Sequence, residues 1–193
     1  FIAGKFAATA SCARFRATAL REGGENASYS REFAFSKSTG RPAVLNTKPN
    51  DSYTFEGASL LVDGYHSRPV FTSGAWLGYL DEPLDVTIDM GGEQSYRSVE
   101  LETLAEKGDW IFPPSSVTVW VSDNGTDFTE VTSVTVPEAK AGDADGIGRY
   151  RMQFPETSAR YLKVVAQNAA AIPAWPPGAG SKGFLFVDEV VVE

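Results

Sequence analysis

Apolar and polar residues alternate along several short segments of this sequence, and a period of two residues is typical of half-buried strands. Residues 84–89 alternate strictly before the pair Gly91-Gly92, and residues 116–122 alternate before the turn sequence Asp123-Asn124-Gly125. Glycine and asparagine suit such turns because they tolerate positive φ. Further strands are predicted in residues 128–136, 148–154, 159–167 and 184–192.

Helix signals are nearly absent by comparison. The one helix-compatible window is the alanine-rich run 166–171, which Pro173 stops. Short strands separated by Gly, Pro, Asn and Asp, without alternating helices, predict an all-β antiparallel sandwich or jelly roll.

The first residues follow the same pattern but stand apart. Residues 13–19 and 29–35 alternate around a glycine-rich turn at 23–26, and residues 36–42 have a linker composition. Because two strands cannot bury a stable core, we expect residues 1–38 to be the closing strands of a preceding small β-sandwich domain plus a linker. The main domain is then 39–193. The alternative is that these strands extend the main sandwich.

Charge and composition exclude several classes of function. The chain has 17 basic and 25 acidic residues, a net charge of −8, which disfavours binding to nucleic acid or to anionic membranes. With only Cys12 and His66, internal disulfides, cysteine zinc clusters and histidine-pair metal sites are excluded. The sequence has no apolar stretch of the roughly 20 residues needed to insert across a membrane.

Specific motifs begin after Ala43. In order they are Leu61-Val62-Asp63-Gly64, Trp76-Leu77-Gly78-Tyr79, residues 84–91, 113–117, 121–128 and 159–164, and Phe186-Val187-Asp188-Glu189-Val190. This ordered set resembles the factor V/VIII type C, or discoidin-like, domain, which includes carbohydrate-binding module family 32. The resemblance implies an eight-stranded antiparallel jelly-roll sandwich.

Two further stretches resemble a particular branch of that family. Gly108-Asp109-Trp110-Ile111-Phe112-Pro113-Pro114 and residues 173–183 look like C-terminal modules of bacterial family 20 glycoside hydrolases, the β-hexosaminidases and chitobiases. Residues 1–36 look like the end of the small sandwich domain that precedes such modules. The resemblance implies a non-catalytic role, a catalytic domain of the same polypeptide as partner, and an extracellular, periplasmic or cell-surface bacterial location.

Trp110 and Trp175 are candidate sugar-binding residues. Each lies in a Gly- and Pro-rich stretch, where an aromatic ring on a loop can offer a flat apolar platform to a pyranose. The alternative is that each tryptophan plugs one end of the sandwich. We expect Trp76 in the core, and Trp120 as a half-exposed sheet residue or a contact to a partner domain.

His66 and Arg68 are candidate hydroxyl-binding residues in the loop 65–75. Imidazole and guanidinium groups bind vicinal hydroxyls, and in the resembled family this loop lies at the ligand-binding edge. The alternative is simple solvation. Many discoidin-like domains place a Thr and a Trp shortly after the Asp-Gly pair, whereas here Ser67 is the nearest hydroxyl and Trp76 follows much later.

Asp63 and Glu189 are candidate ligands of a structural Ca²⁺ ion. Many relatives of the resembled family bind calcium between the Asp-Gly loop and a glutamate of the final strand, and Glu189 occupies that position. Calcium prefers carboxylate and carbonyl oxygens, which a tight loop can supply. The alternative is a turn-capping aspartate and an edge-strand glutamate.

Catalysis by this chain is not expected. The neighbouring acidic residues Asp81, Glu82, Glu100, Glu102, Asp143 and Asp145 are predicted to be exposed turn or strand charges, and no Gly-x-Ser-x-Gly motif is present. The leading hypothesis is a module that binds galactose or N-acetylhexosamine ends of glycans. The alternative is a structural spacer or docking domain that packs on its own catalytic domain, and a lipid- or protein-binding discoidin domain is less favoured because basic surroundings are missing.

Overall fold

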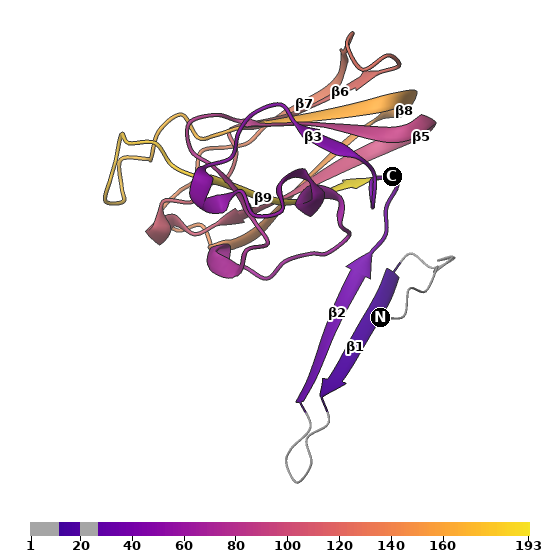
Figure 1. Cartoon of the computed structure of the whole chain (residues 1–193). Helices are drawn as coiled ribbons and strands as arrows, with labels where there is room; N and C mark the ends of the chain where they lie inside the picture. The colour runs from indigo at the N-terminus through magenta and orange to yellow at the C-terminus, as the bar shows by residue number, and fades with distance from the viewer. Residues whose placement is uncertain (1–11, 20–26) are drawn as a thin grey trace.

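A computed structural model of the chain describes residues 12–19 and 27–193. The N-terminal part forms a two-stranded antiparallel sheet from β1 (Cys12–Ala19) and β2 (Ala27–Ala34). This hairpin projects away from the rest of the molecule (Figure 1). The predicted strands are therefore present and do not join the main sheet, while the turn predicted at 23–26 lies outside the described residues.

The remaining strands form one antiparallel sheet that folds into a sandwich. Its hydrogen-bonded order is β4-β9-β5-β8-β6-β7, and β3 pairs with β5. An all-β antiparallel fold is thereby confirmed. The strands are β3 (Ala43–Leu45), β4 (Leu77–Tyr79), β5 (Leu84–Ala105), β6 (Ser116–Ser122), β7 (Thr129–Thr135), β8 (Gly146–Gln167) and β9 (Leu185–Val192).

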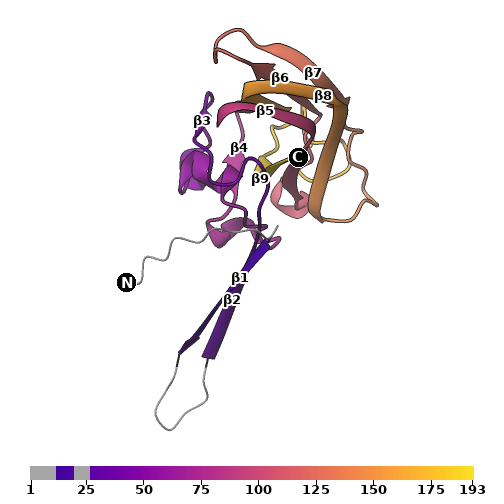
Figure 2. The same ribbon diagram turned by 90° about the vertical axis from the view of Figure 1, so that its right-hand side faces the viewer.

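Two long strands pass through both layers of the sandwich. The first part of β5 pairs with β3 and with the end of β8, whereas its last part pairs with β9 and with the start of β8. The ladder shifts register between Asp89 and Gln94, where Gly91 has a φ of 79°, and such irregularities let strands turn from one layer to the next. Figure 2 shows β8 bending in this way.

This bend changes the strand count expected from the sequence. Residues 148–154 and 159–167 belong to one continuous strand, β8, and the Gly91-Gly92 pair lies within β5 instead of ending it. The main sheet therefore contains seven strands among the described residues, and the expected number of eight is not confirmed.

The core lies between the layers. Alternate residues of β5, β6 and β8 point into it, for example Ile88, Val119 and Val164, each fully buried. Trp76 is also fully buried, as expected, in a smaller cluster with Leu104, Ile111 and Phe186. The alanine-rich window is not helical, because β8 continues to Gln167 and an irregular loop follows.

In residues 12–19 and 27–193, helical structure is limited to four short 3₁₀ segments: η1 (Asp51–Tyr53), η2 (Gly57–Val62), η3 (Phe71–Ser73) and η4 (Lys107–Asp109). They belong to the loops that join the strands. Across the described part of the chain, none of the helices has the length and apolar character needed to traverse a bilayer.

Candidate functional site

Trp110 is held in an unusual backbone conformation at the end of η4. Its φ is +62°, a region that a bulky residue adopts only when its surroundings fix it there. Here the Trp110 carbonyl accepts a hydrogen bond from the Phe184 amide at 2.8 Å, and the Trp110 amide donates to the Lys107 carbonyl at 3.3 Å. The strained turn directs the indole outward, and 44% of the residue remains exposed.

Trp175 is fixed on the neighbouring loop. Its indole N–H donates to the Ala139 carbonyl at 3.3 Å, and its ring meets Phe112 edge-on with centroids 6.4 Å apart. The residue is 41% exposed. A ring whose orientation is set by one hydrogen bond and one aromatic contact can serve as a preformed platform.

The two tryptophan loops pack against each other. Gly178, three residues after Trp175, lies so close to the Trp110 ring that a Cβ there would be 2.8 Å from its Cζ2 atom. Phe112, two residues after Trp110, contacts the Trp175 ring. The structure therefore brings both candidate platforms to one end of the sandwich and leaves both exposed, in contrast to tryptophans that would plug it.

His66 belongs to a second group, with Glu102 and Arg149. The His66 Nδ1 atom lies 2.9 Å from Glu102 Oε2, and Arg149 Nε donates to the same oxygen at 2.8 Å. The hydrogen bond to Glu102 raises the pKa of the His66 imidazole, and burial opposes this only in part. His66 is therefore held by a carboxylate, with its side chain about one-third exposed (31%).

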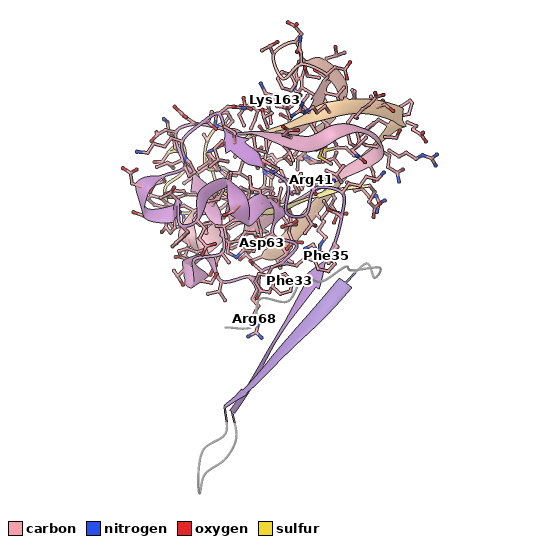
Figure 3. The ribbon with its side chains drawn as sticks, turned by 45° about the vertical axis from the view of Figure 1, so that its right-hand side comes forward. Phe33, Phe35, Arg41, Asp63, Arg68 and Lys163 are labelled. Carbon is pink, nitrogen blue, oxygen red and sulfur yellow. The ribbon has the colours of Figure 1, made fainter. Side chains whose placement is uncertain are left out.

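Arg68 lies beside this group, and its side chain is exposed. Its carbonyl accepts a hydrogen bond from the Trp76 indole at 2.9 Å, which fixes the loop backbone. Figure 3 shows the Arg68 side chain projecting from the sandwich on the side of the hairpin. Glu102 lies on β5, four residues before Glu106, where the loop with η4 begins. Four residues of a strand span about 13 Å. Among the described residues, no hydrogen bond, ion pair or ring contact joins His66 or Arg68 to Trp110 or Trp175.

Glu102 is buried, so the expectation that it is an exposed strand charge is wrong. Only 1% of it is exposed, and its Oε1 atom has no hydrogen-bond partner. Asp188 is equally buried, and its Oδ2 atom accepts a hydrogen bond from the Ser67 amide at 2.8 Å. Sequence reasoning missed Glu102, Arg149 and Asp188 as a group, because the Glu102–Arg149 pairing depends on the register of two long, bent strands.

Asp63 and Glu189, the candidate calcium ligands, lie close enough for the charge of Asp63 to act on Glu189. The Gly64 amide lies 3.2 Å from both carboxylate oxygens of Glu189, and Asp63 Oδ1 accepts the Tyr65 amide at 2.6 Å. Glu189 is 1% exposed on β9, which lies between β4 and β5 and is not an edge strand. Figure 3 places Asp63 near the root of the hairpin.

Burial dominates the electrostatics of this corner, because it disfavours the charged form of the carboxyl groups. Burial, aided by repulsion from Asp63, raises the pKa of Glu189 to about 9, and burial likewise raises the pKa of Asp188 to about 7. Within residues 12–19 and 27–193, no three His, Cys, Asp or Glu side chains are grouped so as to hold a metal ion. A cation here would need backbone carbonyls among its ligands.

The sequence of this chain matches the model of a known protein family. Residues 46–179 match the family model described as F5/8 type C domain, which is more than half of the chain. The chain therefore belongs to the F5/8 type C, or discoidin-like, family. Comparison with curated proteins gave no match.

Solved structures with the same fold include several carbohydrate-binding modules. The Clostridium perfringens module CpGH89CBM32-5, in complex with GalNAc-β-1,3-galactose, is 16% identical with a TM-score of 0.55, over 82% of this chain and 99% of that one. A chitosan-binding module from Paenibacillus sp. IK-5, in complex with chitotriose, is 18% identical with a TM-score of 0.51, over 81% and 98%. A Streptococcus pneumoniae fucose-binding module is 21% identical with a TM-score of 0.51, over 82% and 94%.

Proposed function

We propose that this chain is a non-catalytic module that binds glycans through Trp110 and Trp175. The observation that carries the proposal is that both indoles are exposed, fixed and placed on loops that pack together. The C–H face of a pyranose stacks on such a ring, and neighbouring polar groups bind its hydroxyls. In this proposal His66 and Arg68 bind hydroxyls of the glycan.

The proposed ligands are glycan ends with galactose or N-acetylhexosamine. Support comes from the similar modules in complex with GalNAc-β-1,3-galactose and with chitotriose. Affinity for a single sugar is expected to be weak, because each hydrogen bond to a sugar replaces one to water and gives little net free energy.

The proposed host is a secreted bacterial β-hexosaminidase or chitobiase of family 20. The resemblance of residues 108–114 and 173–183 to modules of such enzymes supports this. The catalytic domain of the same polypeptide is then the partner, and the location is extracellular, periplasmic or at the cell surface. The module would keep the enzyme close to its glycan substrate.

A structural Ca²⁺ ion held by Asp63 and Glu189 is part of the proposal. The donors available are carboxylate and carbonyl oxygens, the type that calcium prefers. Burial raises the pKa of Glu189 to about 9, so without a cation this carboxyl is uncharged at neutral pH, and a bound cation would favour its ionised form. The ion would stabilise the Asp63-Gly64 loop against β9.

A structural spacer is the second candidate, and the segment 34–41 favours it. We call residues 34–41 the strap, and backbone hydrogen bonds join it to the sandwich along its length. The Ala34 amide donates to the Gly64 carbonyl at 2.7 Å, and the Lys37 amide donates to the Val192 carbonyl at 3.0 Å. The Gly40 amide donates to the Val62 carbonyl at 2.7 Å. Ser38 is fully buried, and its hydroxyl donates to Val190 at 2.6 Å. A rigid strap suits a domain that holds its neighbour at a fixed angle.

Titration with galactose, N-acetylgalactosamine, N-acetylglucosamine and lactose, followed by tryptophan fluorescence with and without calcium, tests the binding proposal. We expect a saturable change that is lost in Trp110→Ala or Trp175→Ala and kept in Trp120→Ala, because Trp120 lies on β6, outside the two loops. No change at tens of millimolar sugar would contradict binding and leave the spacer as the better account.

A further inference from the structure

A cavity of about 620 Å³ opens beside Trp175 and has no role in the function proposed above. It is lined by residues 112–115, 136–139, 169–174 and 179–180, which are loop segments and strand ends at the tryptophan-bearing end of the sandwich. This volume lies within the range of about 300–1,000 Å³ that is typical of small-molecule sites.

More than half of the residues that line this cavity cannot donate a backbone hydrogen bond to a ligand. Nine of the sixteen lining residues have no available amide. Four are prolines, which have no N–H: Pro113, Pro114, Pro137 and Pro173. The other five donate to backbone carbonyls at 2.8–2.9 Å: Phe112, Ser115, Val136, Ile172 and Gly180.

Side chains add little polarity to these walls. The Ser115 hydroxyl donates to the Asn168 carbonyl at 2.8 Å, and Glu138 is the one charged residue among those that line the cavity. The surface of the cavity is mostly apolar, so sugar hydroxyls placed inside would lose more hydrogen bonds to water than they regain from the walls, which costs free energy. The cavity is therefore suited to an apolar group.

Trp175 stands at the rim of the cavity. Three of its neighbours are lining residues: Phe112 contacts its ring, the Ala139 carbonyl accepts its N–H, and Ala174 precedes it in the chain. A substituent on a sugar stacked on Trp175 would therefore start at the mouth of the cavity.

We propose that the cavity takes the apolar aglycone of a glycoconjugate, an alkyl chain or aromatic ring joined to the sugar that stacks on Trp175. This inference rests on the proposed glycan binding and specifies its ligand class. The prolines fix φ along the walls, so the cavity is preformed and loses little entropy on binding. The module then prefers glycoconjugates with an apolar aglycone over free sugars.

Matched ligands test this preference. Methyl and hexyl glycosides of N-acetylglucosamine and of galactose, kept below the concentration at which they form micelles, are titrated into the full chain by calorimetry, with hexanol as the ligand without sugar. Each buried methylene adds about fourfold in affinity. We expect at least tenfold tighter binding of the hexyl glycoside than of the methyl glycoside.

A substitution that fills the cavity provides the matched variant. Ala170 is an exposed lining residue, so Ala170→Phe should fill the space without disturbing the core, and Ala179→Phe is a second variant of the same kind. Ala144→Phe, on the exposed turn after Lys140, is the control. We expect the hexyl-to-methyl ratio to fall to about one in the cavity variants and to remain unchanged in the control.

Other outcomes overturn the inference in distinguishable ways. Equal, saturable binding of hexyl and methyl glycosides would reject the aglycone site and leave glycan binding intact. Hexanol binding as tight as hexyl glycoside, without methyl glycoside binding, would show an apolar site unrelated to sugar. If none of the ligands binds, both the proposed function and this inference are contradicted.

Discussion

Trp110 carries backbone strain that ordinary loops avoid. Among the described non-glycine residues only Phe55 and Trp110 have positive φ, and Trp110 is the more exposed of the two candidate platform tryptophans. Such strain persists where the surrounding bonds enforce it, which is frequent at ligand sites. Gly178 matches this geometry, because any larger residue would collide with the Trp110 ring.

Two buried carboxyl groups determine how the free energy of unfolding responds to pH. Asp188 and Glu189 have pKa values raised to about 7 and about 9. Between about pH 4 and pH 9 the folded state therefore binds more protons than the unfolded state. Without metal, we expect the free energy of unfolding to fall as the pH rises from 5 to 8.

Calcium should reverse much of this loss, because it binds ionised carboxylates. At a hundredfold excess over its dissociation constant, a ligand that binds only the folded state adds about 2.7 kcal/mol. We expect a larger calcium-dependent rise of Tm at pH 8 than at pH 5, measured by calorimetry, and almost none in Glu189→Gln. Stability that rises with pH in the metal-free protein would contradict the buried acids, and a Tm indifferent to calcium at pH 8 would contradict the metal.

Among the elements, the strap joins the hairpin to the sandwich through backbone bonds that sequence composition does not reveal. Residues 36–42 have the composition of a flexible linker, yet Ser38 is fully buried against β9. Phe33 at the end of β2 also contacts Tyr65, with ring centroids 5.9 Å apart. The hairpin is therefore tied to the same loop that carries Asp63.

Ser38→Ala should loosen the strap. It leaves the Val190 carbonyl without its hydroxyl donor, a loss of about 1–3 kcal/mol for a buried group. Hydrogen exchange should show protected amides at Lys37 and Gly40 in the native protein and faster exchange there in the variant. The exposed Ser59→Ala is the control. Amides of the strap that exchange as fast as an open loop in the native protein would show it to be a flexible linker.

The same scale shows what local patterns predict. Strict alternation in residues 84–89 and 116–122 correctly predicted β5 and β6, because burial of one face leaves a two-residue period. The length of β5 and β8 was not predictable, since bulges at a bend preserve pairing where glycine and polar residues indicate a turn. The alanine-rich run favours helix by propensity, but pairing with β5 and β6 holds its first residues in β8.

The candidate site was predictable to a similar degree. Trp110 and Trp175 could be selected because Gly- and Pro-rich stretches leave aromatic rings on loops, and the Asp63-Gly64 and Glu189 pairing followed from the family resemblance. The cluster of Glu102, Arg149 and His66 could not be predicted, because its members meet only through long-range register. The cavity beside Trp175 likewise depends on how three loops pack.

In the whole molecule, the hairpin and the tryptophan loops lie at different places on the sandwich. The hairpin and strap attach at the Asp63 corner, where backbone hydrogen bonds join the strap to the sandwich and where the calcium ion is proposed. The tryptophan loops and the cavity lie where η4 and the loop after β8 meet. The hairpin therefore projects on one side of the sandwich (Figure 1), and Trp110 and Trp175 are exposed on another.

Nuclear magnetic resonance of the four tryptophan indole N–H groups tests the glycan-binding account most directly. The signals are assigned by Trp→Phe variants, and the native protein is then titrated with N-acetylglucosamine, galactose and lactose. If glycans bind as proposed, the Trp110 and Trp175 signals shift in a saturable manner. The signals of Trp76, which is buried, and of Trp120, which lies on β6, do not shift. Unchanged Trp110 and Trp175 signals at saturating concentrations of every sugar would contradict the proposed glycan binding.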